Sequence, residues 1–356
     1  MSVAFLALII LWWALIAYAV LGGADFGAGI WDLFAVGRLA QRQRQLINHA
    51  LGPVWEANHT WLIFLIVGLF TIFPVAFAAL SIALFIPFTI ALIGIVLRGA
   101  AFIFRYYATD EHGPFARWWS RVFSATSLLT PFFLGASAAA VASGHLLDDS
   151  GSPHADMIAS WTSPFALTIG AMAAALCASL AAVYLTVEAQ AAKDEELTES
   201  YRMKALIAGA ITSGLGALGL LLSISEAPLL WAGMLQRAIP IVVITMAIGL
   251  ATAAALFFRR YSIARPLIVA EAAFLLGSWG LSQYPFIIPP QLTIANAANE
   301  PGVIVTVLIA IGCGLVILVP SLYYLFSVFK LPSSPAPGLR KEGKEQRKAE
   351  AQAQKQ

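Results

Sequence analysis

The sequence predicts an all-α polytopic membrane protein with nine transmembrane helices, its N-terminus outside and its C-terminus in the cytoplasm. Three observations carry this prediction. The 356-residue chain is 60% hydrophobic and only 11% charged, with a mean hydropathy of +0.82, which excludes a soluble domain. It contains nine apolar runs of about 18 residues or more, the length that crosses a bilayer. Its lysines and arginines gather in every second connection between these runs.

Each of the nine apolar runs is interpreted as one transmembrane helix. No basic residue precedes the first run, so we interpret it as a retained helix and not as a cleaved signal peptide. The second and third runs meet at Pro74, and this tight joint predicts a helical hairpin. The eighth run is the shortest. The predicted spans are Val3–Leu33, Val54–Phe73, Val75–Phe104, Val122–Ser143, Ser163–Glu188, Met203–Ser225, Arg237–Phe258, Pro266–Ser282 and Val303–Phe329.

The positions of the 21 lysines and arginines set the predicted orientation. They follow the first, third, fifth and seventh spans and fill the C-terminal tail; outside these segments stand only Arg98, inside the third span, and Arg237, at the edge of the seventh. Basic connections stay in the cytoplasm. We therefore expect residues 1–330 to form one transmembrane domain and residues 331–356 to form a basic, disordered cytoplasmic tail.

An acidic residue stands at the start of the second span, in the stretch Leu-Gly-Pro-Val-Trp-Glu-Ala-Asn-His-Thr-Trp. Glu56, His59 and Thr60 fall on one face of a helix, and Trp55 and Trp61 flank them as interfacial indoles do. A carboxylate inside the bilayer costs about 2.5 to 3.5 kcal/mol and normally faces a polar interior or a partner. Two interpretations stay open: a polar helix start solvated at the interface, or an acid that conducts ions or binds a ligand.

Two further charged residues are expected inside the membrane. Asp25 lies between Gly23 and Gly27, whose four-residue spacing favours close helix approach. Arg98 lies within the third span, where pairing with Asp25 or Glu56 is a better use of its charge than snorkelling alone. Asp25 is either a structural acid or part of a proton path close to Glu56.

The sequence offers few ligands for a metal or a haem. The two cysteines lie in separate apolar runs and argue against a disulfide framework or a thiolate metal site, so no metal site is predicted. Of five histidines, His59 alone lies near the interior of a span, whereas a bis-histidine haem needs histidines on two facing helices. Methionine ligation stays open. No nucleophile motif or phosphate loop is present, and the chain alone does not look like a complete enzyme.

Four stretches together resemble subunit II of the cytochrome bd quinol oxidases. Trp55-Glu56-Ala57-Asn58-His59-Thr60-Trp61 resembles the family's Trp-acid-Gly-Asn-x-x-Trp signature, and Ala24-Asp25-Phe26-Gly27-Ala28-Gly29 is similar to its Gly-Phe-Asp-Leu-Gly-Val-Gly. The stretch from Arg98 to Arg105 is similar to the family's third-span ending, and the Pro-rich loop from Tyr284 to Ala298 to its last outer loop. The resemblance covers residues 5 to 330.

The resemblance implies a subunit that ligates no haem and pairs with a haem-bearing subunit I in the bacterial inner membrane. Such a complex holds haem b and haem d in subunit I, oxidises quinol and reduces dioxygen to water with protons from the cytoplasm. The lipid bilayer and quinol are then further partners; small accessory subunits stay open, and no nucleic acid is expected.

The resemblance also implies roles for individual residues. The acid after the first Trp of the signature is implicated in proton delivery, and here it is Glu56. We predict proton transfer by Glu56, Asp25 and His59. Structural or charge-pairing roles are predicted for Arg98, Arg105, Trp55, Asn58 and Trp61.

Two positions depart from the family. Gly22 and Ile103 stand where many members carry acids, so the proton route does not transfer whole. His59 is a hypothetical substitute relay, because histidine is the residue type whose unperturbed side chain changes charge near neutral pH. Two other functions stay open. An autonomous ion or small-molecule transporter also suits nine spans with buried acids, and a structural scaffold would use its acids only to pair with Arg98.

Overall fold

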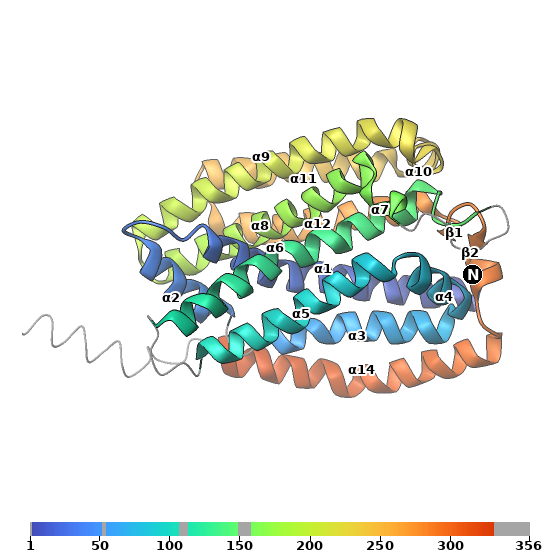
Figure 1. The fold of residues 1–356 in the computed structure, drawn as a ribbon, viewed down its shortest axis with the longest axis horizontal. Helices are drawn as coiled ribbons and strands as arrows, with labels where there is room; N and C mark the ends of the chain where they lie inside the picture. Colours follow the sequence, from blue (N-terminus) through green and yellow to red (C-terminus); the bar gives the residue numbers. More distant parts are fainter. Residues whose placement is uncertain (1, 52–54, 107–112, 149–157, 331–356) are drawn as a thin grey trace, which may run out of the picture.

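The computed structural model describes residues 2–51, 55–106, 113–148 and 158–330. Within these ranges the chain forms a bundle of long helices that share one direction (Figure 1). Eight of the described helices are long and apolar enough to cross a membrane, and a ninth crossing results if one bent pair counts as a single span. The predicted all-α, multi-span fold is confirmed. The predicted tail, 331–356, lies outside the described residues.

The helices follow the apolar runs, and most extend beyond them by a few polar residues. The short eighth run forms a full helix, α12. The elements are α1 (Val3–Leu33), α2 (Ala40–Leu51), α3 (Trp55–Ile72), α4 (Pro74–Ala83), α5 (Phe85–Tyr106), α6 (Pro114–Ser143), α7 (Ala159–Thr162), α8 (Pro164–Ala191), α9 (Glu195–Glu226), α10 (Pro228–Gly233), the π-helical η2 (Met234–Ala238), α11 (Ile239–Phe257), α12 (Tyr261–Gln283), β1 (Phe286–Ile288), β2 (Leu292–Thr293), α13 (Ile294–Ala297) and α14 (Pro301–Lys330).

Local signals place several helix ends. The Ser163 hydroxyl caps α8 by accepting the N–H of Ala166 at 3.2 Å, and Pro164 occupies the first helical position, where its missing N–H costs nothing. Asp194 caps α9 through the N–H of Leu197 at 3.1 Å. Gly144 ends α6 at φ +79°, a left-handed conformation that favours glycine.

The predicted hairpin at Pro74 is wrong in its detail. Pro74 begins a separate ten-residue helix, α4, which is bent by 118° from α3. The long helix that follows α4 is α5, which starts at Phe85. The stretch from Val75 to Leu97 contains no charged residue, so hydropathy alone does not locate the break within it. The chain therefore reverses through α4 and not through a tight turn.

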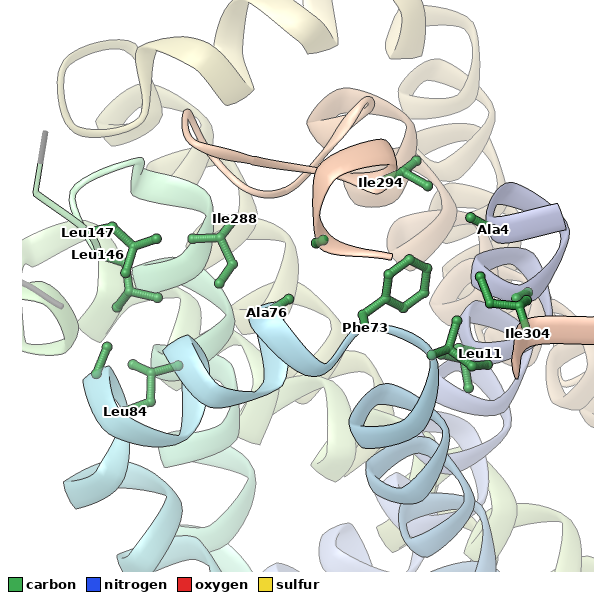
Figure 2. Close-up of a cluster of buried hydrophobic side chains, with 14 of the residues drawn as sticks. Ala4, Leu11, Phe73, Ala76, Leu84, Leu146, Leu147, Ile288, Ile294 and Ile304 are labelled. Atoms are coloured by element: carbon green, nitrogen blue, oxygen red, sulfur yellow. The ribbon is translucent and has the colours of Figure 1, made fainter. Parts of the chain in front are cut away.

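The bend after α3 is held by a buried apolar cluster at one end of the bundle (Figure 2). Phe73 is fully buried there and lies near Leu11 of α1, Ile294 of α13 and Ile304 of α14. Asn299 completes the junction, because its backbone N–H donates to the carbonyl of Ile72 at 2.8 Å. One otherwise unsatisfied carbonyl at the end of α3 is thus paired. The loop between α13 and α14 therefore fixes the helix reversal.

At the opposite end of the bundle lies α2, which the hydropathy of the sequence does not predict (Figure 1). Its residues Ala, Gln, Arg and Leu favour a helix but are too polar for a span. Ile47 is fully buried in a cluster that includes Leu197 of α9. Arg42 also pairs with both Asp194 and Glu196, so that α2 is tied to the start of α9 by packing and charge.

The ion pair of Asp194 makes a testable contribution to stability. Burial raises the pKa of Asp194, but hydrogen bonds from Arg42 and from the backbone outweigh it, and the net pKa lies below the usual aspartate range. A carboxyl with a lowered folded-state pKa stabilises the fold above its unfolded pKa, and this stabilisation disappears as the pH falls through the folded value. We expect Asp194→Asn, which keeps a good helix cap, to lower the melting temperature slightly at pH 7.

The same difference should shrink as the pH falls below about 4, where Asp194 is protonated first in the unfolded state, and should vanish once the folded protein protonates it as well. Thermal unfolding of the purified complex at several pH values measures it. A difference between wild type and Asp194→Asn that stays constant into acid would contradict the assignment.

Candidate functional site

The centre of the candidate site is formed by Asp25 of α1, Asn58 of α3 and Arg98 of α5, all buried. The Asn58 side-chain amide donates to Asp25 Oδ2 at 2.8 Å. Arg98 Nη2 donates to the backbone carbonyl of Asp25, also at 2.8 Å. The structure therefore brings together three residues that the sequence predicts for the site, and the hydrogen bond described from Arg98 goes to the main chain of Asp25.

The guanidinium of Arg98 contacts residues of both α1 and α6. Its Nε donates to Ser127 Oγ of α6 at 3.0 Å, and its central carbon lies 4.9 Å from the ring centroids of both Phe26 and Phe123. Cation–π contacts and charge-assisted hydrogen bonds are strongest where water is excluded, and Arg98 is only 3% exposed. Arg98 is consequently a buried cation and does not snorkel to the surface.

His59 and Trp61 lie beside this centre on α3. The His59 ring packs edge-on against Tyr18, with centroids 6.1 Å apart, and against Phe26 at 6.0 Å. Trp61 is partly buried against the apolar cluster that contains Tyr18 and Phe26. Thr60, the third member of the predicted polar strip, is exposed. The predicted strip therefore does not face one environment: the His59 side chain faces α1, whereas Thr60 lies on the exposed side of α3.

Three predicted residues cannot be placed by their side chains. Glu56 and Trp55 occupy the first turn of α3, and Arg105 lies near the end of α5, but the side chains of all three lie outside the described part of the structure.

Close approach of helices makes the centre possible. A Cβ added at Gly27 would overlap the carbonyl oxygen of Cys177 in α8, and one added at Gly29 would overlap the Ser127 hydroxyl. Gly94 of α5 likewise faces Thr130 of α6. The prediction of close packing at Gly27 is confirmed, with α8 as the neighbour.

Two buried or half-buried acids of the structure are not among the residues predicted from the sequence. Asp32, in the last turn of α1, has a side chain that is 1% exposed and accepts hydrogen bonds from Ser120 and Ser124 of α6. Its position seven residues after Asp25, on the same helix face, is the signal that could have found it. Glu271 lies in the middle of α12 and faces Gly249 and Thr252 of α11. An acid inside an apolar run is the corresponding signal there.

Comparisons with known proteins point to one family. The family model described as cytochrome bd terminal oxidase subunit II matches residues 3–329. A putative cytochrome bd menaquinol oxidase subunit II from Bacillus subtilis is 24% identical over 335 residues, which cover 92% of this chain and 95% of that protein. A cytochrome bd ubiquinol oxidase subunit 2 from the same organism is 30% identical over 182 residues, 50% of this chain and 52% of that protein.

A solved structure shares the fold. The bd oxidase from Geobacillus thermodenitrificans contains a chain that superposes with a TM-score of 0.73 at 24% identity, covering 94% of this chain and 100% of that one. The family match over nearly the whole length and the helical membrane fold lead to one assignment: this chain belongs to the cytochrome bd terminal oxidase subunit II family.

Proposed function

We propose that this chain ligates no haem itself, supports assembly of its oxidase, and carries protons from the cytoplasm toward the haem-bearing subunit through Glu56, Asp25 and His59. The observation that carries the proposal is the buried centre of Asp25, Asn58 and Arg98, with the His59 ring beside it. Ionisable groups at this depth are costly and mark ion or proton pathways by default.

Membership of the family makes the chain part of a membrane-bound oxidoreductase complex that contains haems, uses quinol and includes a subunit I. Its own residues suit a haem poorly. In the described spanning helices His59 is the only histidine, and its ring packs against Tyr18 and Phe26. This enclosure favours a relay of protons over ligation of iron, and the haems are therefore assigned to the partner.

The proposed location is the bacterial inner membrane. The end of the bundle with α2 carries the ion pairs of Arg38 and Arg42 with Glu196, and that of Arg265 with Glu188 at 3.8 Å. Positive residues concentrate on the cytoplasmic side of membrane proteins. We therefore place α2 in the cytoplasm and the N-terminus outside.

Within the centre each group has a defined task. The fixed positive charge of Arg98 offsets the negative charge that Asp25 carries when it has passed its proton on. The Asn58 amide holds the Asp25 carboxyl toward α3, the helix that also carries Glu56 and His59. Asp25 can thus take up and release a proton without reorienting the surrounding helices.

The direct test of the proton role is Glu56→Gln in the purified complex. The amide keeps the size of the side chain but cannot carry a proton, so we expect turnover to fall by about tenfold or more while the haem spectrum is unchanged. Oxygen consumption with a soluble quinol measures it. Glu300→Gln, a change of an exposed acid at the opposite end, is the control. Wild-type turnover of Glu56→Gln would favour the purely structural scaffold.

Membership of a complex is tested separately. The chain, tagged and extracted in mild detergent, should carry with it a second polytopic subunit and the haem b and haem d bands of a reduced-minus-oxidised spectrum. A haem-free single chain from cells that make such an oxidase would contradict the proposal and favour transport.

A further inference from the structure

Asp32 is a second buried acid of α1 that the proton route above does not use. Its Oδ2 accepts hydrogen bonds from Ser124 Oγ at 3.1 Å and from Ser120 Oγ at 3.2 Å. Its Oδ1 lies 3.4 Å from Nε of Arg44, whose side chain is 48% exposed. A carboxyl that is itself shielded thus stands one side chain away from water at the α2 end of the bundle.

A line of hydroxyl groups connects Asp32 with the buried centre. Ser120, Ser124 and Ser127 of α6, here called the serine seam, are spaced i, i+4 and i+7 and so lie on one face of that helix. The first two donate to Asp32, and the third accepts from Arg98 Nε. The serine seam therefore has Asp32 at one end and the Arg98 centre at the other.

The facing surface of α1 follows the same spacing. Asp25, Gly29 and Asp32 are also related as i, i+4 and i+7, and Gly29 leaves the space that the Ser127 hydroxyl occupies. Seven residues of helix separate the two acids by about 10 Å along the axis. Hydroxyls one helical turn apart lie about 5 to 6 Å from each other, a gap that one bridging water spans.

Among the residues that the structure describes, two charged or titratable side chains are seen to face Asp32. Arg44 reaches it from α2, and the phenol of Tyr201 lies within electrostatic range from α9. From α6 it meets the two serine hydroxyls, which do not titrate. The Arg44 guanidinium therefore lies beside the Asp32 carboxyl on the side that reaches solvent.

We propose that Asp32 collects protons from the cytoplasm and passes them along the serine seam to Asp25, an inference that rests on the proton role proposed above. In each transfer the Asp32 carboxylate gains one proton from water beside Arg44 and then releases one into the seam, and Asp25 gains one. Each serine hydroxyl and bridging water accepts one proton and gives up another, so that all of them end unchanged.

The test is the pH dependence of turnover and of proton uptake in the purified complex carrying Asp32→Asn. Without a collecting acid, uptake depends on free protons in water, so the rate should match wild type near pH 6 and fall about tenfold below it near pH 8. A pH-indicator dye, read as the quinol-reduced complex meets oxygen, should show the same slowing of uptake. Asp32→Glu should restore the wild-type profile.

Two further variants keep the proposal falsifiable. Glu188→Gln removes another half-buried acid at the same end of the bundle and should leave the profile unchanged. If Asp32→Asn fails to assemble, the double variant Ser120→Ala with Ser124→Ala should show the same loss at high pH. A rate lowered equally at all pH values, or a profile like that of wild type, would overturn the role of Asp32.

Comparison with Glu56→Gln separates the two proposals. If Glu56→Gln slows turnover while both seam variants keep the wild-type pH profile, the chain carries protons but not through Asp32. If neither Glu56→Gln nor Asp32→Asn changes turnover or uptake, the proton role of the whole chain fails.

Discussion

Arg98→Met should prevent the assembled complex from accumulating in the membrane. Methionine fills much of the same volume but removes the donors to the Asp25 carbonyl and to Ser127 Oγ, and it removes the positive charge from a place that is 3% exposed. Removing one partner of a buried charged pair costs about 3–5 kcal/mol of stability, because the remaining charge is left buried where water cannot solvate it. Such a loss is comparable to the whole stability of many domains.

The amount of heterodimer in detergent extracts and its melting temperature measure this effect. Arg98→Lys keeps the charge but not the planar group that lies between the rings of Phe26 and Phe123, so we expect an intermediate result. Arg260→Met changes an exposed arginine and should behave as wild type. Normal accumulation of Arg98→Met would show that the Asp25 centre does not need its cation.

Much of the fold follows from the sequence because the bilayer imposes one dominant rule. Apolar length alone places α1 at Val3–Leu33, the same bounds that the structure shows. The rule fails where the hydropathy of the sequence does not mark a helix or its end. α4 and α5 share one apolar run, and α2 is too polar to be read as a span although Ile47 buries it against the bundle.

The candidate site also contains residues that the sequence predicts and a residue that it does not. The cost of isolated charge in lipid predicts that Asp25 and Arg98 seek partners, and the structure places them in contact. Asp32 is different, because it stands one residue before the end of its span and looks interfacial in the sequence. Only the packing of α1 against α6 shows that its carboxyl is buried and faces the serine seam.

Gly27→Leu should separate α1 from α8 and lose the complex. Any Cβ at position 27 would overlap the carbonyl carbon and oxygen of Cys177, and these are backbone atoms that cannot rotate away. Overpacking a tight interface typically costs about 1–3 kcal/mol, and more where the backbone itself must move. The displacement would also reach the functional centre, because Asp25 and Phe26 directly precede Gly27 and hold Arg98.

Gly214→Leu is the matched control, because position 214 of α9 is also a glycine within a spanning helix and no atom lies within 4 Å of a Cβ added there. Its heterodimer yield and melting temperature should equal those of wild type, while Gly27→Leu loses both. Equal behaviour of the two variants would mean that α1 and α8 do not depend on this contact. Loss confined to Gly27→Leu would show that assembly requires the contact between α1 and α8 at Gly27. Because the same contact positions Asp25, stability and the proposed proton transfer would then depend on the same segment of α1.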